Sequence, residues 1–141
     1  MANSKRIFID TSAWIEYLIS KERYHALVAD CLDREAEAGS KFFTSDYVID
    51  ETLTRLITSD QFRVAKFFKE YVEKAEKNGE ILILWTDRAV FAKAWHYFEK
   101  FKEHKLSFTD AAVVAFVKDL KIDEVLTLDK GFSKVGLTAR P

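Results

Sequence analysis

Short apolar runs alternate with longer amphipathic stretches along the whole chain. Apolar residues in the short runs are nearly continuous, which predicts buried strands, because a half-exposed strand would alternate apolar and polar residues. The longer stretches repeat apolar residues at three- and four-residue steps and contain no internal Gly or Pro, so they predict helices. The predicted strands cover residues 7–9, 41–44, 81–85 and 125–128, and the predicted helices cover residues 11–19, 23–37, 45–58, 62–77, 87–101 and 110–120.

This order of elements predicts a single α/β domain over residues 1–141, with a mainly parallel central sheet. A chain of 141 residues buries about two thirds of its unfolded surface, which suffices for one hydrophobic core. We find no linker-like segment and no internal repeat that would divide it. Residues 111–117 are apolar on nearly every face, which predicts a central helix with Asp110 at its first turn.

Composition and charge exclude several classes of protein. The single cysteine, Cys31, excludes an intramolecular disulfide and a cysteine-based zinc site. The longest apolar run is too short to cross a membrane, and residues 1–6 lead into a strand rather than a signal-peptide core, so we expect a cytoplasmic protein. The formal net charge is only −1, so nucleic-acid binding would require a local basic patch. The candidates for such a patch are Arg55, Lys102, Lys105, Lys130 and Lys134.

Four acidic residues lie where apolar runs end or helices begin, and we expect them to form one cluster. They are Asp10, Glu51, Asp110 and Asp129. In an open parallel sheet the carboxyl ends of the strands border the functional crevice, so residues that are distant in sequence meet there. Two carboxylates about 4 Å apart repel by roughly 4 kcal/mol at an effective dielectric near 20. A cluster of four therefore predicts a bound divalent cation, and hydrolytic chemistry that uses it.

Three of these acids also have a structural interpretation. Asp10 would cap the following helix, and Asp110 would form a capping box with Ser107, three residues before it. Asp129 would be a turn residue, because aspartate side chains hydrogen-bond their own backbone in turns.

Glu51 has a different alternative, an exposed ion pair with Arg55 one helical turn later. Helical periodicity does not decide between Asp50 and Glu51 as the acid that faces the cluster.

The segments around the four acids resemble, in order and spacing, the acidic motifs of PIN-domain nucleases. The resemblance extends from Ile7 to Phe132, and the length of the chain is similar to that of single-domain PIN proteins, including toxins of the VapBC type. The segments that carry the resemblance are residues 7–14 (IFIDTSAW), 44–52 (TSDYVIDET), 106–111 (LSFTDA) and 126–132 (LTLDKGF).

The resemblance implies a Rossmann-like sheet of four to five strands with helices on both faces, and metal-dependent endoribonuclease activity. It places the acids of the family on the four residues above, and so selects Glu51 over Asp50. It also places hydroxyls at Thr11 and Ser12, where they would hold the carboxylate of Asp10 or a metal-bound water.

The chemistry of phosphodiester hydrolysis favours the same acids, because Mg²⁺ or Mn²⁺ selects oxygen ligands and generates a nucleophile from water at neutral pH. We expect Asp10 and Asp110 to bind the principal ion, Asp129 to complete the site or bridge through water, and Glu51 to orient the attacking water or bind a second ion. Either one or two ions fit this set. No histidine base is required, and we expect the three histidines to be surface or packing residues. They are His25, His96 and His104.

Two other classes of function compete with a nuclease. A phosphoacceptor or phosphatase-like α/β domain would use Asp10 and Asp87 with Lys130, but such a phosphatase requires an aspartate where this chain has Ser12. A non-catalytic PIN scaffold would bind only RNA or protein. The resemblance further implies an RNA substrate, a homodimer and, for a toxin, an antitoxin partner, and Arg55 and Lys130 are candidates for substrate contact.

Overall fold

Five parallel strands form one sheet in the order β3-β2-β1-β4-β5. The computed structural model describes residues 4–141. The strands are β1 (Arg6–Ile9), β2 (Lys41–Ser45), β3 (Ile81–Leu84), β4 (Glu124–Leu126) and β5 (Ala139–Arg140). Because β1 lies between β2 and β4, the chain moves to one side of β1 and later crosses to the other. This reversal places a ligand-binding crevice at the carboxyl end of β1 and β4.

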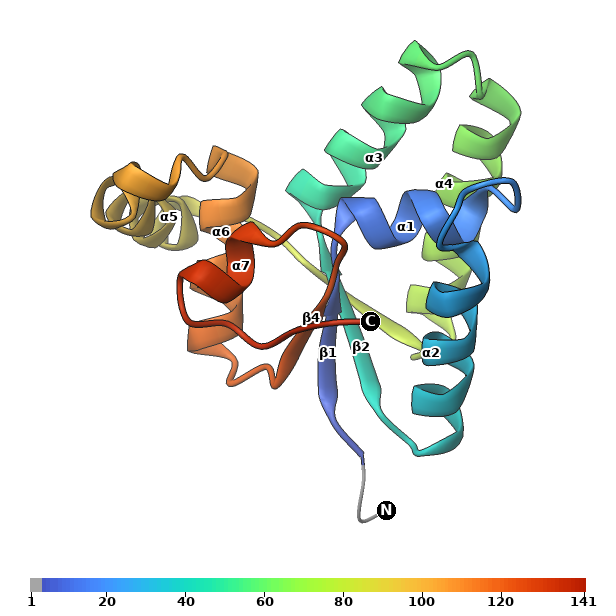
Figure 1. The fold of residues 1–141 in the computed structure, drawn as a ribbon, viewed down its shortest axis with the longest axis horizontal. Coiled ribbons are helices and arrows are strands. Elements are labelled where there is room, and N and C mark those ends of the chain that lie inside the picture. The colour runs from blue at the N-terminus through green and yellow to red at the C-terminus, as the bar shows by residue number, and fades with distance from the viewer. Residues whose placement is uncertain (1–3) are drawn as a thin grey trace.

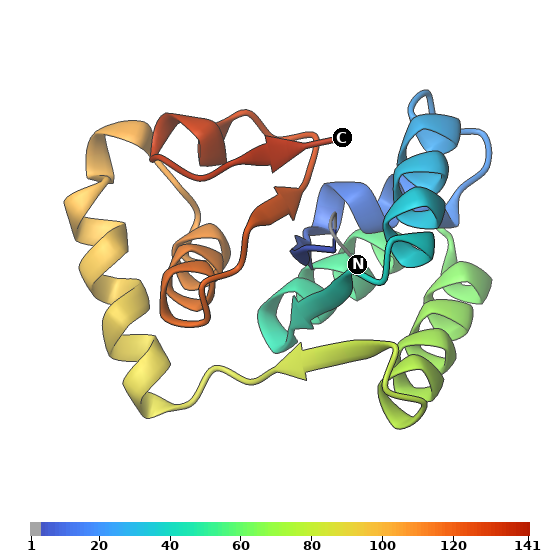
Figure 2. The same ribbon diagram turned by 90° about the horizontal axis from the view of Figure 1, so that it is seen from below.

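Helices cover both faces of the sheet. They are α1 (Thr11–Leu18), α2 (His25–Glu37), α3 (Asp46–Thr58), α4 (Phe62–Lys77), α5 (Arg88–Lys100), the 3-10 helix η1 (Lys102–His104), α6 (Phe108–Asp119) and α7 (Gly131–Lys134). Figure 1 shows α1, α2 and α4 on one side of the strands and α5, α6 and α7 on the other. Figure 2 gives the same division seen from below. The predicted Rossmann-like α/β fold, with a parallel sheet and helices on both faces, is confirmed.

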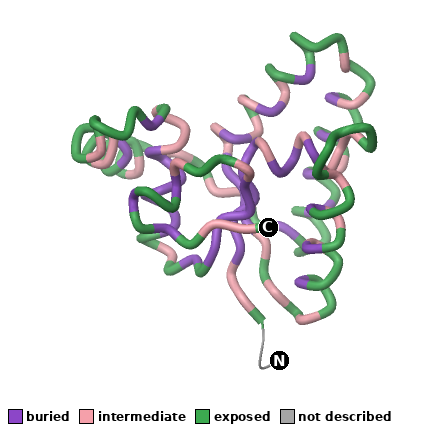
Figure 3. Tube along the Cα trace, in the orientation of Figure 1, coloured by how far each residue is buried: buried purple, intermediate pink, exposed green. Residues whose placement is uncertain are grey.

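The core lies where the sheet meets the inner faces of these helices, and buried segments concentrate there in Figure 3. Helix α6 is buried at every position from 111 to 117, which confirms the prediction of a central helix. Trp14 on α1 is 1% exposed, packs against Phe68 of α4, and donates a hydrogen bond from Nε1 to Oγ1 of Thr44 at 3.1 Å. This contact fixes the start of α1 beside β2.

The carboxyl-terminal elements differ from the prediction. We expected a strand over residues 125–128, whereas β4 ends at Leu126 because the Leu128 amide donates instead to Oγ of Ser12 at 2.8 Å. The strand begins one residue earlier, at Glu124, which pairs with Ile7 of β1, and Arg140 and Lys5 neutralise its carboxylate. The predicted strands did not include β5, nor the predicted helices α7, since two and four residues are too few for a periodic pattern.

The other helices match their predictions to within two residues at either end. Helix α6 begins two residues before Asp110 because the Ser107 hydroxyl accepts a hydrogen bond from the Asp110 amide at 3.0 Å. No helix within residues 4–141 is both long and apolar enough to cross a membrane. The first three residues of the amino-terminal segment, in which we expected no signal peptide, lie outside the described residues.

Candidate metal centre

Four elements bring the predicted acids to the carboxyl end of the sheet. Asp10 follows β1 directly, and Asp129 follows β4 after two residues. Asp110 lies in the first turn of α6, and Glu51 lies in the second turn of α3. Figure 1 shows the beginnings of α3 and α6 on either side of this end of the sheet. The structure therefore places all four residues around the crevice at β1 and β4.

Asp10 is the most deeply buried of the four, with 3% of its surface exposed. Burial raises the pKa of Asp10 from 3.8 to about 6, and the negative charges of Glu51 and Asp129 add to the rise. The Thr127 hydroxyl and the nearby Thr11 amide oppose it. Asp10 occupies the N-cap position of α1, but its side chain makes no capping hydrogen bond. The capping interpretation of Asp10 is therefore wrong.

Asp110 is half-buried, and burial raises its pKa from 3.8 to about 7. The negative charges of Asp10, Asp129 and Glu51 raise it further, while Ser107 opposes the rise. Each of the other three acids thus acts on Asp110, so the group forms one electrostatic cluster rather than four separate surface charges. Glu51 forms no ion pair with Arg55, and it is less exposed than Asp50.

Asp129 is exposed and is held by the turn that follows β4. Its Oδ1 accepts a hydrogen bond from the Gly131 amide at 2.8 Å, and its own amide donates to Oγ1 of Thr127 at 3.0 Å. The turn interpretation of Asp129 is thus confirmed. It does not remove Asp129 from the cluster, because the charge of this residue acts on both Asp10 and Asp110.

Thr127 links the two strand ends and was missed in the sequence, where we considered only the hydroxyls after Asp10. Its hydroxyl donates to Oδ2 of Asp10 at 2.8 Å, and Oγ of Ser12 lies 3.1 Å from it. Ser12 therefore reaches the carboxylate through Thr127 rather than directly. The available signal was a hydroxyl residue inside the apolar run 125–128, two positions before an acid.

The two buried side-chain oxygens without a hydrogen-bond partner among residues 4–141 are Oδ1 of Asp10 and Oγ1 of Thr11. The Thr11 amide stabilises the Asp10 charge from nearby without hydrogen-bond geometry to Oδ1. An unpaired buried polar group costs about 1–3 kcal/mol, so two adjacent ones at a crevice require a reason. A hard cation that takes oxygen ligands fits both atoms and the surrounding carboxylates.

The acids converge without being in contact. Within residues 4–141, no group of three His, Cys, Asp or Glu side chains lies close enough to hold an ion as the side chains stand. Carboxylates that repel one another separate unless a cation or proton lies between them. What links the four acids is the effect of their charges on the pKa values of Asp10 and Asp110.

The remaining candidates lie on the periphery. Arg55 is exposed on α3. A hydrogen bond with Glu16 raises the pKa of Glu22, and the positive charge of Arg55 opposes that rise. Lys130 is exposed in the turn beside Asp129. The expectation for the histidines is confirmed. His25 hydrogen-bonds a backbone carbonyl, and His96 and His104 are exposed and lie beside aromatic rings.

Asp87 is the N-cap residue of α5, where its Oδ1 accepts a hydrogen bond from the Val90 amide at 2.9 Å. It follows β3, the edge strand, and β2 separates that strand from β1 and Asp10. An acceptor aspartate acting together with Asp10 would have to lie on a strand adjacent to β1. The geometry therefore favours the capping role of Asp87 over the phosphoacceptor role.

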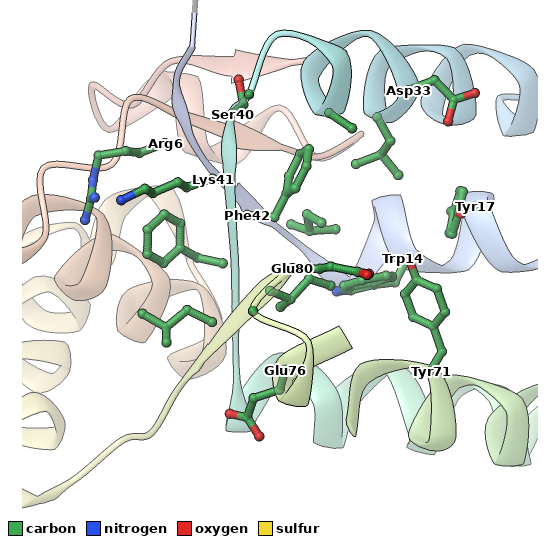
Figure 4. A pocket seen from close by; sticks show the side chains of 18 residues that line it. Arg6, Trp14, Tyr17, Asp33, Ser40, Lys41, Phe42, Tyr71, Glu76 and Glu80 are labelled. Carbon is green, nitrogen blue, oxygen red and sulfur yellow. The ribbon is translucent and has the colours of Figure 1, made fainter. Parts of the chain in front are cut away.

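A cavity lies elsewhere in the molecule, and none of the four acids lines it. This cavity of about 750 Å³ lies between α2 and α4, at the beginnings of β2 and β3. Figure 4 shows Trp14, Tyr17, Phe42 and Tyr71 around it, with charged side chains such as Glu80 at its rim. Among the residues that line it, none presents a buried carboxylate oxygen without a hydrogen-bond partner, as Asp10 does.

Comparison with known proteins gives a consistent result. The chain is 28% identical to ribonuclease VapC26 of Mycobacterium tuberculosis over 124 residues, which are 88% of this chain and 87% of that protein. Its fold is similar to the crystal structure of VapC20 of M. tuberculosis, a sarcin-ricin loop cleaving toxin, with a TM-score of 0.79, 22% identity, and 94% and 96% of the two chains covered. VapBC2 of Rickettsia felis, bound to a DNA fragment from its promoter, matches with a TM-score of 0.66, 9% identity, and 95% and 96% covered.

The family assignment follows from a match that spans nearly the whole chain. The PIN domain family matches residues 7–137, a range that contains all four acids and every strand except β5 and the first residue of β1. The resemblance seen in the sequence is confirmed, and the chain belongs to the PIN domain family.

Proposed function

We propose that this chain is a divalent-cation-dependent endoribonuclease that hydrolyses RNA phosphodiester bonds at the carboxyl end of β1 and β4. The observation that carries the proposal is the buried, unpaired Oδ1 of Asp10 inside a cluster of four mutually repelling acids. The similarity to ribonuclease VapC26 supports RNA as the substrate class. We also propose that residues 1–141 act as a single PIN domain.

We assign the residues as follows. Asp10 and Asp110 would hold the principal Mg²⁺ or Mn²⁺, because Asp10 is buried at the end of β1 and Asp110 is half-buried in the first turn of α6. Asp129 would complete the site or act through water, and Glu51 would orient the attacking water or hold a second ion. When bound, the cation supplies a stronger nucleophile from water and stabilises charge on the phosphoryl oxygens.

The side chains around the acids would orient the substrate and the carboxylates. Thr127 donates its proton to Asp10 and keeps that carboxylate in place. Thr11 lies at the same end of β1, and its buried hydroxyl oxygen has no hydrogen-bond partner. This oxygen would accept a hydrogen bond from water. Lys130, exposed beside Asp129, and Arg55 on α3 would contact phosphates of the RNA as point charges outside the reacting bond.

The test is RNA cleavage by Asp10→Asn and Asp110→Asn in the presence of Mg²⁺. Both variants should keep the wild-type circular dichroism spectrum and lose cleavage, because each loses a negative ligand without a change of shape. The matched control is Asp87→Asn, which removes an exposed carboxylate at the end of β3 and keeps a good helix cap. Wild-type cleavage by both Asp10→Asn and Asp110→Asn would rule out the assignment.

The same control separates the phosphoacceptor alternative. A phosphoacceptor domain would lose function in Asp87→Asn, and the wild type would gain a lasting phosphoryl group after incubation with a small phosphodonor. Intact mass measurement detects that adduct directly. The nuclease proposal expects no adduct and full RNA cleavage by Asp87→Asn. A non-catalytic scaffold would instead bind RNA without cleaving it in any variant.

We further propose that the protein forms a homodimer in the cytoplasm and acts as the toxin of a toxin–antitoxin pair. The similarity to VapC20 and VapBC2 supports this role. A single buried cysteine fits a reducing compartment. A small DNA-binding protein encoded just upstream would identify the antitoxin, and its co-purification with this chain and inhibition of RNA cleavage would test the pairing.

A further inference from the structure

We propose that Thr127 is a positioning residue that holds Oδ2 of Asp10, so that Asp10 binds the cation through Oδ1 alone and the site prefers Mg²⁺ or Mn²⁺ to Ca²⁺. This inference rests on the proposed function, because it specifies how the metal site of that nuclease is set. It adds a residue that is not one of the four acids, and it assigns a role to each oxygen of Asp10.

The direction of the hydrogen bonds around Thr127 is fixed by simple accounting. An ionised carboxylate only accepts, so the single hydroxyl proton of Thr127 goes to Oδ2 of Asp10, at 2.8 Å. The two lone pairs of Thr127 then accept from the Asp129 amide at 3.0 Å and from the Ser12 hydroxyl at 3.1 Å. Ser12 in turn accepts from the Leu128 amide at 2.8 Å. With Asp10 ionised, each donor in this group of hydrogen bonds therefore has one acceptor.

Burial makes this arrangement rigid. Thr127 is 4% exposed and Asp10 is 3% exposed, so water does not compete for the hydrogen bond between them. Oδ1 of Asp10 is buried as well and has no partner among residues 4–141. The two oxygens of Asp10 thus differ: Oδ2 accepts a hydrogen bond from the protein, and Oδ1 remains available to a ligand. Oγ1 of Thr11, the other buried oxygen without a partner, belongs to the next residue.

An oxygen that already accepts a buried hydrogen bond is a weaker metal ligand than an oxygen without a partner, so this carboxylate favours binding a cation through Oδ1 rather than through both oxygens. Mg²⁺ requires six ligands in near-octahedral positions and takes carboxylates through one oxygen, whereas Ca²⁺ accepts more ligands and often takes both oxygens of one carboxylate. The hydrogen bond from Thr127 therefore favours the smaller ions. Partners of this kind, which contact a ligand rather than the metal, typically change metal affinity by about 10- to 100-fold when they are removed.

The experiment measures binding of Mn²⁺ and of Ca²⁺ to the full chain, without RNA, by electron paramagnetic resonance for Mn²⁺ and by calorimetry for Ca²⁺. Thr127→Val removes the hydroxyl and keeps the shape, and it should lower the ratio of Mn²⁺ to Ca²⁺ affinity by about tenfold. Thr127→Ser keeps the hydroxyl and should retain the wild-type ratio. The matched control is Thr52→Val, which removes an equally buried hydroxyl that bonds only the Val48 carbonyl of its own helix, at 2.7 Å.

A purely structural role would lower both affinities together and leave the ratio unchanged, so an unchanged ratio in Thr127→Val overturns the inference. If Thr127→Val fails to fold, Thr127→Ala decides instead. It removes the same hydroxyl without adding a second γ methyl group and should lower the ratio in the same direction, and a wild-type ratio in that variant overturns the inference.

Failure of the proposed function is distinguishable from failure of this inference. If the wild type and Asp10→Asn both bind no Mn²⁺, the metal site itself is wrong and the inference falls with it. If the wild type binds Mn²⁺, Asp10→Asn does not, and Thr127→Val keeps the wild-type ratio, the metal site stands and only the role of Thr127 is wrong.

Discussion

Replacing Asp10 by Asn should stabilise the metal-free protein at pH 8, although the same change removes a proposed metal ligand. Asp10 is 3% exposed, and burial, with the charges of Glu51 and Asp129, raises its pKa from 3.8 to about 6. A carboxyl whose pKa is raised by folding is less stable as an anion in the folded chain than in the unfolded chain. The metal-free cluster therefore weakens the fold whenever Asp10 is ionised.

The sign and size of the effect follow from the shift. Stabilisation by the neutral carboxyl is complete below pH 3.8 and is lost as the pH rises through about 6. At about 1.36 kcal/mol per pKa unit the loss is about 3 kcal/mol, and it is smaller where Asp110 takes up the shared proton instead. Asn is uncharged and still accepts the hydrogen bond from Thr127, so Asp10→Asn avoids this loss. In a domain of this size, about 3 kcal/mol corresponds to a rise of about 10 °C in Tm.

Thermal unfolding in EDTA, followed by circular dichroism at pH 4 and pH 8, measures the effect. Asp10→Asn should melt well above the wild type at pH 8 and close to it at pH 4. Asp50→Asn, an exposed neighbour of Glu51, should match the wild type at both values. Added Mn²⁺ should raise the Tm of the wild type and not that of Asp10→Asn. If Asp10→Asn is no more stable than the wild type at pH 8, Asp10 does not carry the buried charge described above.

Three further predictions concern the carboxyl-terminal part of the chain. Arg140→Met should lower the free energy of unfolding in urea by about 3 kcal/mol, because it leaves Glu35 and Glu124, at 2.6 and 2.9 Å from the guanidinium, without their shared cation; an unchanged midpoint would contradict this. Gly131→Ala should weaken Mn²⁺ binding in calorimetry while the protein stays folded, since the new Cβ would lie 3.2 Å from Oδ1 of Asp129. Lys130→Ala should slow RNA cleavage and leave Mn²⁺ affinity unchanged, and the slope of cleavage rate against salt concentration should fall by the equivalent of about one phosphate contact. A loss of metal binding would place Lys130 in a different role.

The sequence was sufficient for the elements that have a strong local pattern. Continuous apolar runs predicted the four longer strands, and residues 111–117 predicted the buried helix α6 because no face of that segment is polar. The position of the acids relative to strand ends predicted that they would converge, since the carboxyl ends of parallel strands share one edge of the sheet. Periodicity did not choose between Asp50 and Glu51, because both lie on the polar side of α3, and the choice came from the family resemblance.

The features that the sequence did not predict depend on contacts between distant segments. Thr127 and Ser12 are 115 positions apart, and their hydrogen bond exists only because β1 and β4 are neighbours in the sheet. Strand β5 has two residues and is held by β4 and by the ion pairs of Arg140, so no local pattern marks it. The capping interpretation of Asp10 failed because its Oδ2 accepts a hydrogen bond from the distant Thr127 and its Oδ1 accepts none from the helix.

The backbone segments that carry the acids differ in rigidity, and this difference bears on the proposed roles of the acids. Asp10 follows a strand that is hydrogen-bonded on both sides, and Asp110 lies in the first turn of a helix whose residues 111–117 are all buried, so their backbones have little freedom to move. Asp129 lies in an exposed turn, where its position depends on hydrogen bonds to Thr127 and Gly131. A small octahedral ion tolerates little variation in its direct ligands but accepts water-mediated contacts. The rigid pair is therefore the better choice for direct ligands, and Asp129 is better suited to adjust when substrate enters.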